Sequence, residues 1–253
     1  MLYFRLTCGG SVLKNLLIGD VHGDIFNLEK VFKKAVSEDC KNIIQLGDFG
    51  FGFPSYTLFH SQIEQLIERY KIPLYFLKGN HDNHEILNKY TSITELSKDY
   101  YFIPNGVEFS FDGVSFIAYG GAYSIDKKFR TEGVDFWRDE EISISDVYNS
   151  KGKVADIMLT HDTPYTSNIM DYMVLLPIEE AMENRKKLQA IVEEIKPKKI
   201  FHGHYHSRIN CSANYTEGEI VTWFPCIGLA ANVNKLEQQC YVFDTVLFKQ
   251  EKL

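Results

Sequence analysis

The chain has 253 residues, of which 45% are apolar and 24% are charged. These values are ordinary for a globular protein with a substantial core, and we expect a single domain over residues 1–253. The formal net charge of −7 disfavours non-specific attraction to nucleic-acid backbones, so a nucleic acid is expected only as a substrate.

Targeting and redox signals are weak. The chain has no run of about 18 apolar residues, and its first residues lack a basic segment, so we expect neither a membrane span nor a signal peptide. The five cysteines are scattered without a CxxC pair, which favours free thiols over a disulfide framework. We therefore expect a cytoplasmic protein, and its oligomeric state stays open.

The first third of the chain alternates between short apolar runs and helical patterns. Residues 2–7 predict an outer strand, and residues 16–18, 42–46 and 74–77 predict core strands. Between them, apolar spacing predicts a helix that starts after Asp24, its N-cap, and ends near Asp39, and a second helix over 59–70. This alternation predicts right-handed βαβ units with both sheet faces covered.

The remainder is more varied. Residues 83–90 predict a short helix capped by Asn83, and residues 109–119 predict a hairpin that turns at Asp112-Gly113. Residues 120–141 read as a long ordered loop, a kind of segment that is often functional. Further predictions are a strand at 155–159, a helix around 188–195, a strand at 199–201 and a β-rich tail that includes 220–224 and 241–243. We expect two mixed sheets packed face to face with helices outside.

Five apolar runs end in side chains that can bind a metal: Asp20 and His22, Asp48, Asn80 and His81, His161, and His204 and His206. One such histidine would be unremarkable, but five strand ends of this kind are not expected by chance. The mixture of carboxylate, amide and imidazole groups favours manganese, iron, cobalt, nickel or zinc, with manganese preferred. Seven ligands, without His81, are too many for one ion and suit two ions about 3.5–4 Å apart that share a carboxylate.

The motifs GDVHG, LGDFG, GNHD, THD and GHYH, in this order, resemble those of the calcineurin-like metallophosphoesterase family. The resemblance implies a four-layered α/β-sandwich. It also implies that Asp20, His22, Asp48 and His206 hold one metal ion, and that Asn80, His161 and His204 complete the site of a second ion, bridged by Asp48. The expected reaction is attack on phosphorus by a hydroxide that bridges both ions. The resemblance assigns protonation of the leaving oxygen, or stabilisation of its charge, to His81, for which a structural role is the alternative.

Departures from the family motifs narrow the range of expected substrates. Serine/threonine protein phosphatases continue the second motif as GDxxDRG, whereas this chain has Phe51 and Gly52 there, and Lys78 replaces the usual arginine before GNH. The stretches GDFGFGF and GGAYSIDKKFRTEGVDFW resemble small phage and bacterial metallophosphatases that accept phosphodiesters and nucleotides. We therefore expect a phosphodiesterase with some phosphomonoesterase activity that acts on a small phosphoester or nucleotide.

Two alternatives stay open. One is a serine/threonine protein phosphatase or a dinucleotide phosphatase. The other is a protein-binding module with this fold, as in the retromer subunit that resembles the family. The module is disfavoured because none of the seven ligand positions is degraded in this sequence.

A few residues outside the motifs are also candidates. The loop 120–141 is expected to form a wall of the active-site mouth, with Arg130 contacting phosphate and Tyr123 contacting substrate; the alternative is a surface loop. Arg208 is expected either to reach phosphate or to pair with an acid. His84 is expected on a helix surface, with a position facing the cleft as the alternative.

Overall fold

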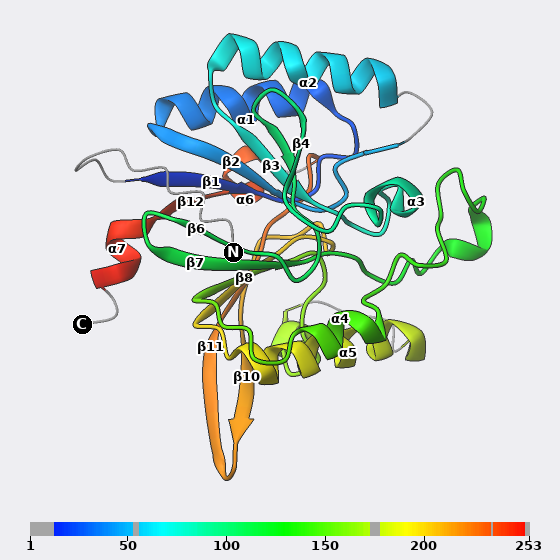
Figure 1. The fold of residues 1–253 in the computed structure, drawn as a ribbon, viewed down its shortest axis with the longest axis vertical. Coiled ribbons are helices and arrows are strands. Elements are labelled where there is room, and N and C mark those ends of the chain that lie inside the picture. Colours follow the sequence, from blue (N-terminus) through cyan, green and yellow to red (C-terminus); the bar gives the residue numbers. More distant parts are fainter. Residues whose placement is uncertain (1–12, 53–55, 173–177, 234, 251–253) are drawn as a thin grey trace.

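Two six-stranded sheets lie at the centre of the fold (Figure 1). The computed structural model describes residues 13–52, 56–172, 178–233 and 235–250. The first sheet has the order β12 (Cys240–Asp244), β1 (Lys14–Ile18), β2 (Cys40–Leu46), β3 (Leu74–Leu77), β5 (Tyr100–Phe102) and β4 (Thr94–Ser97). The second has the order β10 (Ile209–Glu217), β11 (Ile220–Gly228), β9 (Lys199–His202), β8 (Ile157–Thr160), β7 (Val114–Tyr119) and β6 (Glu108–Phe111).

Helices cover the outer faces of both sheets (Figure 1). α1 (Ile25–Ser37) and α2 (Tyr56–Tyr70) pack on the first sheet, while α4 (Ile144–Asn149) and α5 (Glu179–Ile195) pack on the second. Short elements complete the chain: α3 (His84–Leu87), α6 (Leu236–Gln239), α7 (Thr245–Gln250), and the 3₁₀ helices η1 (Lys127–Phe129) and η2 (Asn168–Asp171). Among the described residues, no helix has both the length and the apolar composition needed to cross a membrane.

The apolar runs are continuous because the central strands are buried on both faces. In β1, Leu16 and Ile18 pack under the helices α1 and α2, whereas Leu17 points into the core between the two sheets. Each fully buried side chain of this size contributes roughly 1.5–3 kcal/mol. The neighbouring strands β1, β2, β3 and β5 are parallel, as are β7, β8 and β9, so their carboxyl ends lie along common edges.

The structure confirms the two-sheet architecture, the first helices and the hairpin. Asp24 caps α1 by accepting a hydrogen bond from the Asn27 amide at 2.9 Å. Asp112 and Gly113 turn the β6–β7 hairpin with φ angles of 47° and 71°, the left-handed values that a tight primed turn requires. The predicted strand at 2–7 lies outside the described residues.

Two features go beyond the expectation. The predicted strand at 241–243 is present as β12, and it pairs antiparallel with β1 in the first sheet. The β4–β5 hairpin was not predicted, because Thr94–Ser97 is polar and only partly buried at the edge of the sheet and carries no apolar alternation.

Candidate active site

The candidate ligands follow strand ends in both sheets. Asp20, Asp48 and Asn80 come after β1, β2 and β3, whereas His161 and His204 come after β8 and β9. The structure brings these side chains together at one end of the sandwich, where they form two clusters of potential metal ligands.

The first cluster consists of Asp20, His22 and His206. Asp20 Oδ1 accepts the backbone N–H of His204 at 3.0 Å. Its Oδ2 lies 3.1 Å from His206 Nε2 and 3.6 Å from His22 Nε2, and the two Nε2 atoms are 3.1 Å apart. One carboxylate oxygen and two ring nitrogens therefore converge on a single point.

The second cluster surrounds Asp48, which is 1% exposed. Its Oδ1 lies 3.4 Å from His161 Nε2, which is also 3.0 Å from Asn80 Oδ1. The Nδ1 of His161 lies 2.8 Å from the Leu46 carbonyl oxygen, to which it can only donate. His204 stands edge-on to the His161 ring at 5.1 Å between centroids, so the four predicted side chains meet here.

The charges in this second cluster are strongly coupled. Burial disfavours the His161 cation, but the negative charge of Asp48 outweighs it and raises the pKa of His161 to about 10. Burial likewise opposes ionisation of Asp48, yet the charge of His161 holds the pKa of that carboxyl well below its usual value. Burial lowers the pKa of His204 to about 4, so its ring is neutral at pH 7.

Glycines before the ligands allow the strand ends to approach one another. A Cβ on Gly79 would lie 2.1 Å from Asp48 Oδ1, and one on Gly203 would lie 2.3 Å from Asp20 Oδ1. Both distances are far inside van der Waals contact, so any side chain at these positions would displace a candidate ligand. The glycines of the GNHD and GHYH motifs are thus required by close packing.

A chain of buried hydrogen bonds fixes the Asn80 amide. Asn80 Nδ2 donates to Ser124 Oγ at 2.8 Å, and Ser124 Oγ donates to Glu140 Oε2 at 2.7 Å. The Ser124 amide also donates to Glu140 Oε1 at 2.8 Å. With its nitrogen engaged, the amide presents Oδ1 to the second cluster. Sequence reasoning missed Ser124 and Glu140, since nothing in the spacing of the 120–141 loop marks them.

His81 lies beside both clusters and faces the loop 120–141. Its Nε2 is 3.2 Å from Arg130 Nη2, 3.1 Å from Asn80 Nδ2 and 4.0 Å from Asp48 Oδ2. Both nitrogen neighbours are donors, so Nε2 acts as the acceptor. Burial, together with the charge of Arg130, lowers the pKa of His81 against the opposing effect of Asp48.

The Arg130 side chain is held in place by Asp126. Nε and Nη2 of the guanidinium donate to the two carboxylate oxygens of Asp126, each at 2.7 Å. This fork geometry restricts the guanidinium and keeps Nη2 against His81. The structure therefore places Arg130 beside His81, and its contact with phosphate stays a prediction.

A cavity of about 760 Å³ opens over the ligands. One side consists of Asp48, Asn80, His81, His204 and His206. The loop 120–141 supplies Tyr123, Ser124, Ile125 and Asp126, and the opposite side consists mainly of Tyr165, Met170, Ala181, Met182, Arg185 and Tyr205. The loop thus forms one wall, and the far wall is largely apolar.

Three other positions do not supply cations to this cavity. Arg208 donates to the Cys240 carbonyl oxygen at 3.3 Å and lies over the Tyr241 ring, so the structure does not bring it to the candidate site. Lys78 is buried and its Nζ donates to Asn88 Oδ1. Phe51 packs in the core, stacked on Phe76.

Buried polar residues behind the ligands were not singled out from the sequence. Asp82 accepts backbone N–H groups from four residues of the surrounding loops, and Asp162 accepts hydrogen bonds from Tyr205 and Asn184. Their positions directly after His81 and His161 were the available signal.

The expectation of a surface His84 is wrong: the side chain is fully buried, with Nε2 2.7 Å from the Gly79 carbonyl oxygen.

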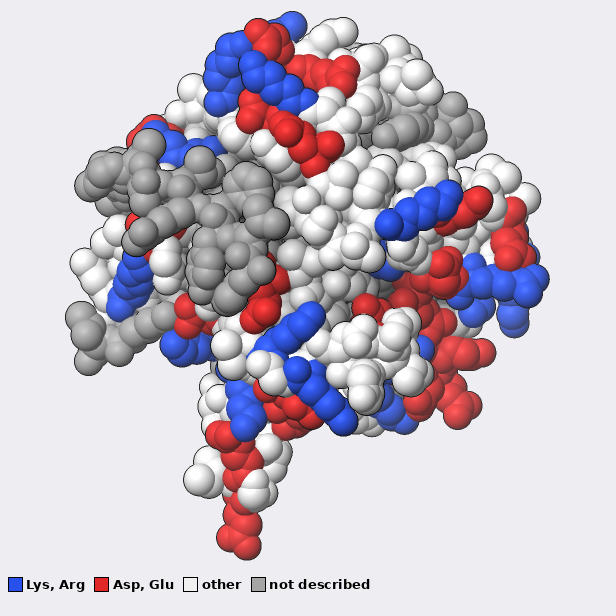
Figure 2. Space-filling model, viewed as in Figure 1, with Lys and Arg blue, Asp and Glu red and all other residues white. Residues whose placement is uncertain are grey.

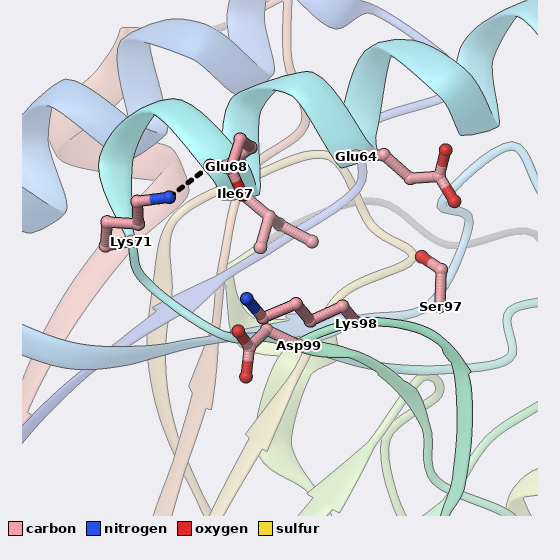
Figure 3. A pocket seen from close by; sticks show the side chains of 7 residues that line it. All are labelled: Glu64, Ile67, Glu68, Lys71, Ser97, Lys98 and Asp99. Atoms are coloured by element: carbon pink, nitrogen blue, oxygen red, sulfur yellow. Dashed lines mark hydrogen bonds and ion pairs between the residues drawn. The ribbon is translucent and has the colours of Figure 1, made fainter.

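A second hollow, of about 210 Å³, lies between α2 and the β4–β5 turn (Figure 3). It contains the Lys71–Glu68 ion pair together with Lys98 and Asp99, and none of the candidate ligands. Among the described residues on the face seen in Figure 2, positive and negative side chains are mixed and form no continuous basic surface.

The residues present fit two divalent cations. Among the described residues, Asp20 Oδ2 has no hydrogen-bond donor, although two imidazole nitrogens face it. In the second cluster, His161 Nε2 faces Asp48 Oδ1 and Asn80 Oδ1, to which it can only donate. A metal cation could take the position of this proton. Nitrogen and oxygen donors without a thiolate suit borderline or hard ions, and a histidine whose other nitrogen donates to a carbonyl is the usual metal-binding arrangement.

Comparisons with known proteins agree with this chemistry. The model of the calcineurin-like phosphoesterase family matches residues 13–208. The crystal structure of TT1561 of Thermus thermophilus is 12% identical, with a TM-score of 0.50 over 92% of this chain and 99% of that one. A dimetal phosphatase from Danio rerio is 13% identical, with a TM-score of 0.51 over 88% of this chain and 89% of that one. At such identities these structures show the shared fold, and curated proteins gave no significant match. Because the family model spans most of the chain, the protein belongs to the calcineurin-like phosphoesterases and is a phosphoric ester hydrolase.

Proposed function

We propose that the protein is a two-metal phosphodiesterase with weaker activity on phosphomonoesters, acting on small phosphoesters or nucleotides. This proposal rests on the small number of cationic side chains that are available to a phosphate in the cavity. Arg130 is the cationic side chain placed against His81, while Lys78 and Arg208 are engaged elsewhere. Arg185 also lines the cavity, but its guanidinium donates to backbone carbonyl oxygens. A dianionic monoester gains more from additional cations than a diester, which carries a single negative charge.

In this proposal the two clusters hold the ions. Asp20, His22 and His206 bind one, Asn80, His161 and His204 bind the other, and Asp48 is shared. Two bound cations would lower the pKa of a water molecule and neutralise the phosphoryl oxygens during in-line attack. The nitrogen and oxygen donor set is compatible with manganese, iron, cobalt, nickel or zinc, and we favour manganese because carboxylate and carbonyl oxygens suit it.

The protein's own groups then position the ester. Phosphate oxygens would compete with His81 for Arg130 Nη2, because the guanidinium forms stronger hydrogen bonds with an anion than with a neutral imidazole. Asp126 keeps the fork oriented during this exchange. His81, released from Arg130, would stand beside the leaving oxygen and donate a proton to it or stabilise its charge.

The apolar wall has room for the second substituent of a diester. Tyr165, Met170 and Met182 line the side of the cavity opposite the loop. Aromatic and thioether groups favour a planar or apolar substituent such as a nucleobase or an aryl group. A free phosphomonoester would leave much of this wall uncovered.

The direct test compares hydrolysis of a bis-aryl phosphate and a mono-aryl phosphate under the same metal. We expect a higher kcat/KM for the diester. A strong preference for the monoester would favour the phosphatase alternative. The absence of turnover on both substrates with any of the five metals would contradict the proposed substrate class.

A further inference from the structure

A second group of potential metal ligands lies outside the candidate active site. It consists of His202 at the end of β9, Cys211 on β10 and Cys226 on β11, whose ligand atoms lie within 4.8 Å of one another. His202 and Cys226 are fully buried and Cys211 is 5% exposed. Cys211 and Cys226 face each other across the antiparallel pair β10–β11.

The His202 imidazole is oriented as a metal ligand would be. Its Nδ1 lies 3.0 Å from the Gly203 carbonyl oxygen, to which it can only donate. The neutral ring therefore carries a lone pair on Nε2, and this buried atom has no hydrogen-bond partner among the described residues. A ring whose other nitrogen donates to a backbone carbonyl is the usual arrangement of a metal-binding histidine.

The two thiols already have other partners. Cys211 Sγ donates to the Cys226 carbonyl oxygen at 3.0 Å, and Cys226 Sγ lies 3.4 Å from Thr163 Oγ1. Burial raises the pKa of the Cys226 thiol well above its usual value, whereas hydrogen bonding from Cys226 lowers that of Cys211 against the effect of burial. Both thiols must release their protons when a metal ion binds.

The strand register favours a dithiol site over a disulfide. Glu217 pairs with Ile220 across a two-residue turn, so hydrogen-bonded pairs recur at every second position and include Cys211–Cys226. The Cβ atoms of such pairs are more widely spaced than the ~3.8 Å that a disulfide prefers. Both cysteines are free in the structure.

We propose that His202, Cys211 and Cys226 form a third metal site, selective for a thiophilic closed-shell ion such as zinc and independent of the two-metal centre. Zinc bonds of ~2.0–2.3 Å require ligand atoms roughly 3.5–3.8 Å apart, so the thiols need only small rotations about their Cα–Cβ bonds. The Thr163 hydroxyl or a water molecule supplies the fourth ligand, and the thiol protons are released to solvent. The ion braces β9, β10 and β11 close to the strand end that carries His204.

Cadmium is the most informative probe, because thiolate-to-cadmium charge transfer absorbs in the ultraviolet and the nitrogen and oxygen ligands of the active site give no such band. The reduced, metal-free protein is titrated with cadmium. We expect a charge-transfer band whose final amplitude corresponds to one thiolate-bound cadmium ion per chain, and a cadmium-dependent rise in the thermal unfolding temperature that is smaller in Cys211→Ser. Cys211→Ser should lose the band while remaining folded by circular dichroism, and Cys226→Ser gives an independent measurement of the same loss.

Three other thiols provide the control. A variant with Cys8→Ser, Cys40→Ser and Cys240→Ser should keep the full band, because the proposed site uses only Cys211 and Cys226, which stay unchanged. The proposal is overturned if the wild-type protein shows no band, if the band persists in folded Cys211→Ser, or if the unreduced protein is isolated with Cys211 and Cys226 joined as a disulfide. The readout does not involve hydrolysis, so it is separate from the proposed function.

Discussion

Replacement of Ser124 by alanine tests whether the hydrogen-bond chain from Glu140 to Asn80 controls metal binding. The change removes one hydroxyl that accepts from Asn80 Nδ2 at 2.8 Å and donates to Glu140 Oε2 at 2.7 Å. The Ser124 amide would still donate to Glu140. All three side chains are 1% exposed, so water does not easily replace the missing group.

The substitution should change the unfolding free energy and the metal affinity by different amounts. A buried polar group left without a partner costs about 1–3 kcal/mol. Glu140 Oε2 loses its donor, whereas Asn80 Nδ2 still reaches His81 Nε2 at 3.1 Å, so the metal-free variant should lose about 1–3 kcal/mol of unfolding free energy. Residues that orient a metal ligand change metal affinity by about 10–100-fold. We therefore predict that Ser124→Ala binds one of its two ions about 10–100-fold more weakly and that activity recovers largely at saturating metal.

The assay is a metal titration of the metal-free protein by calorimetry, with hydrolysis of an aryl diester followed over the same metal range. Ser150→Ala is a matched control, because its hydroxyl is also buried but donates to the Val147 carbonyl oxygen at 2.7 Å in α4. Glu140→Gln should resemble Ser124→Ala, since an amide cannot accept both the N–H and the O–H of Ser124. Metal affinities of Ser124→Ala and Glu140→Gln equal to that of Ser150→Ala would refute the reasoning.

Four further predictions follow from the site. Asp48→Asn should fold, bind less metal and lose nearly all hydrolysis, and full metal content with normal activity would contradict a shared ligand. His81→Ala should keep its metal and slow esters with poor leaving groups more than activated aryl esters; equal losses would indicate a structural role. Arg130→Ala should lower kcat/KM about 10–100-fold through loss of charge-assisted hydrogen bonds, whereas Arg138→Ala, whose side chain is 81% exposed in the same loop, should not. Burial raises the pKa of Glu140 to about 7 from 4.5. The protonated side chain should therefore contribute fully to the stability of the metal-free protein below pH 4.5, and this contribution should be lost as the pH rises through about 7. Denaturant unfolding should show the loss in the wild type and not in Glu140→Gln.

The sequence was most informative where short-range patterns coincide with burial. The strands that end in Asp20, Asp48 and His161 are buried on both faces, so they read as continuous apolar runs with a polar residue at the end. The caps Asp24 and Asn83 act over three residues, a distance at which sequence and structure correspond closely. Local rules therefore located most of the fold and the candidate ligands.

Contacts between distant segments were harder to predict. Ser124 and Glu140 meet Asn80 through hydrogen bonds that join the third strand end to an irregular loop, and irregular backbone has no periodicity to indicate which side chains point inward. His84 was placed on a helix surface, but α3 is a single turn, too short for helical spacing to define a face. The pairing of β12 with β1 likewise joins the two ends of the described chain.

The backbone conformation at the strand ends brings the candidate ligands together. Four of the seven candidates have φ in the left-handed region: His22 (49°), Asp48 (55°), His204 (69°) and His206 (52°). Each such residue costs of the order of 1–3 kcal/mol and persists only where surrounding contacts determine it. Here the Asp48 carbonyl oxygen accepts the amides of Val21 and His22 at 3.0 and 2.9 Å, and Asp20 Oδ1 accepts that of His204. These hydrogen bonds join the strand-end loops to one another without any ion, so metal ions should bind to a preformed arrangement rather than create it.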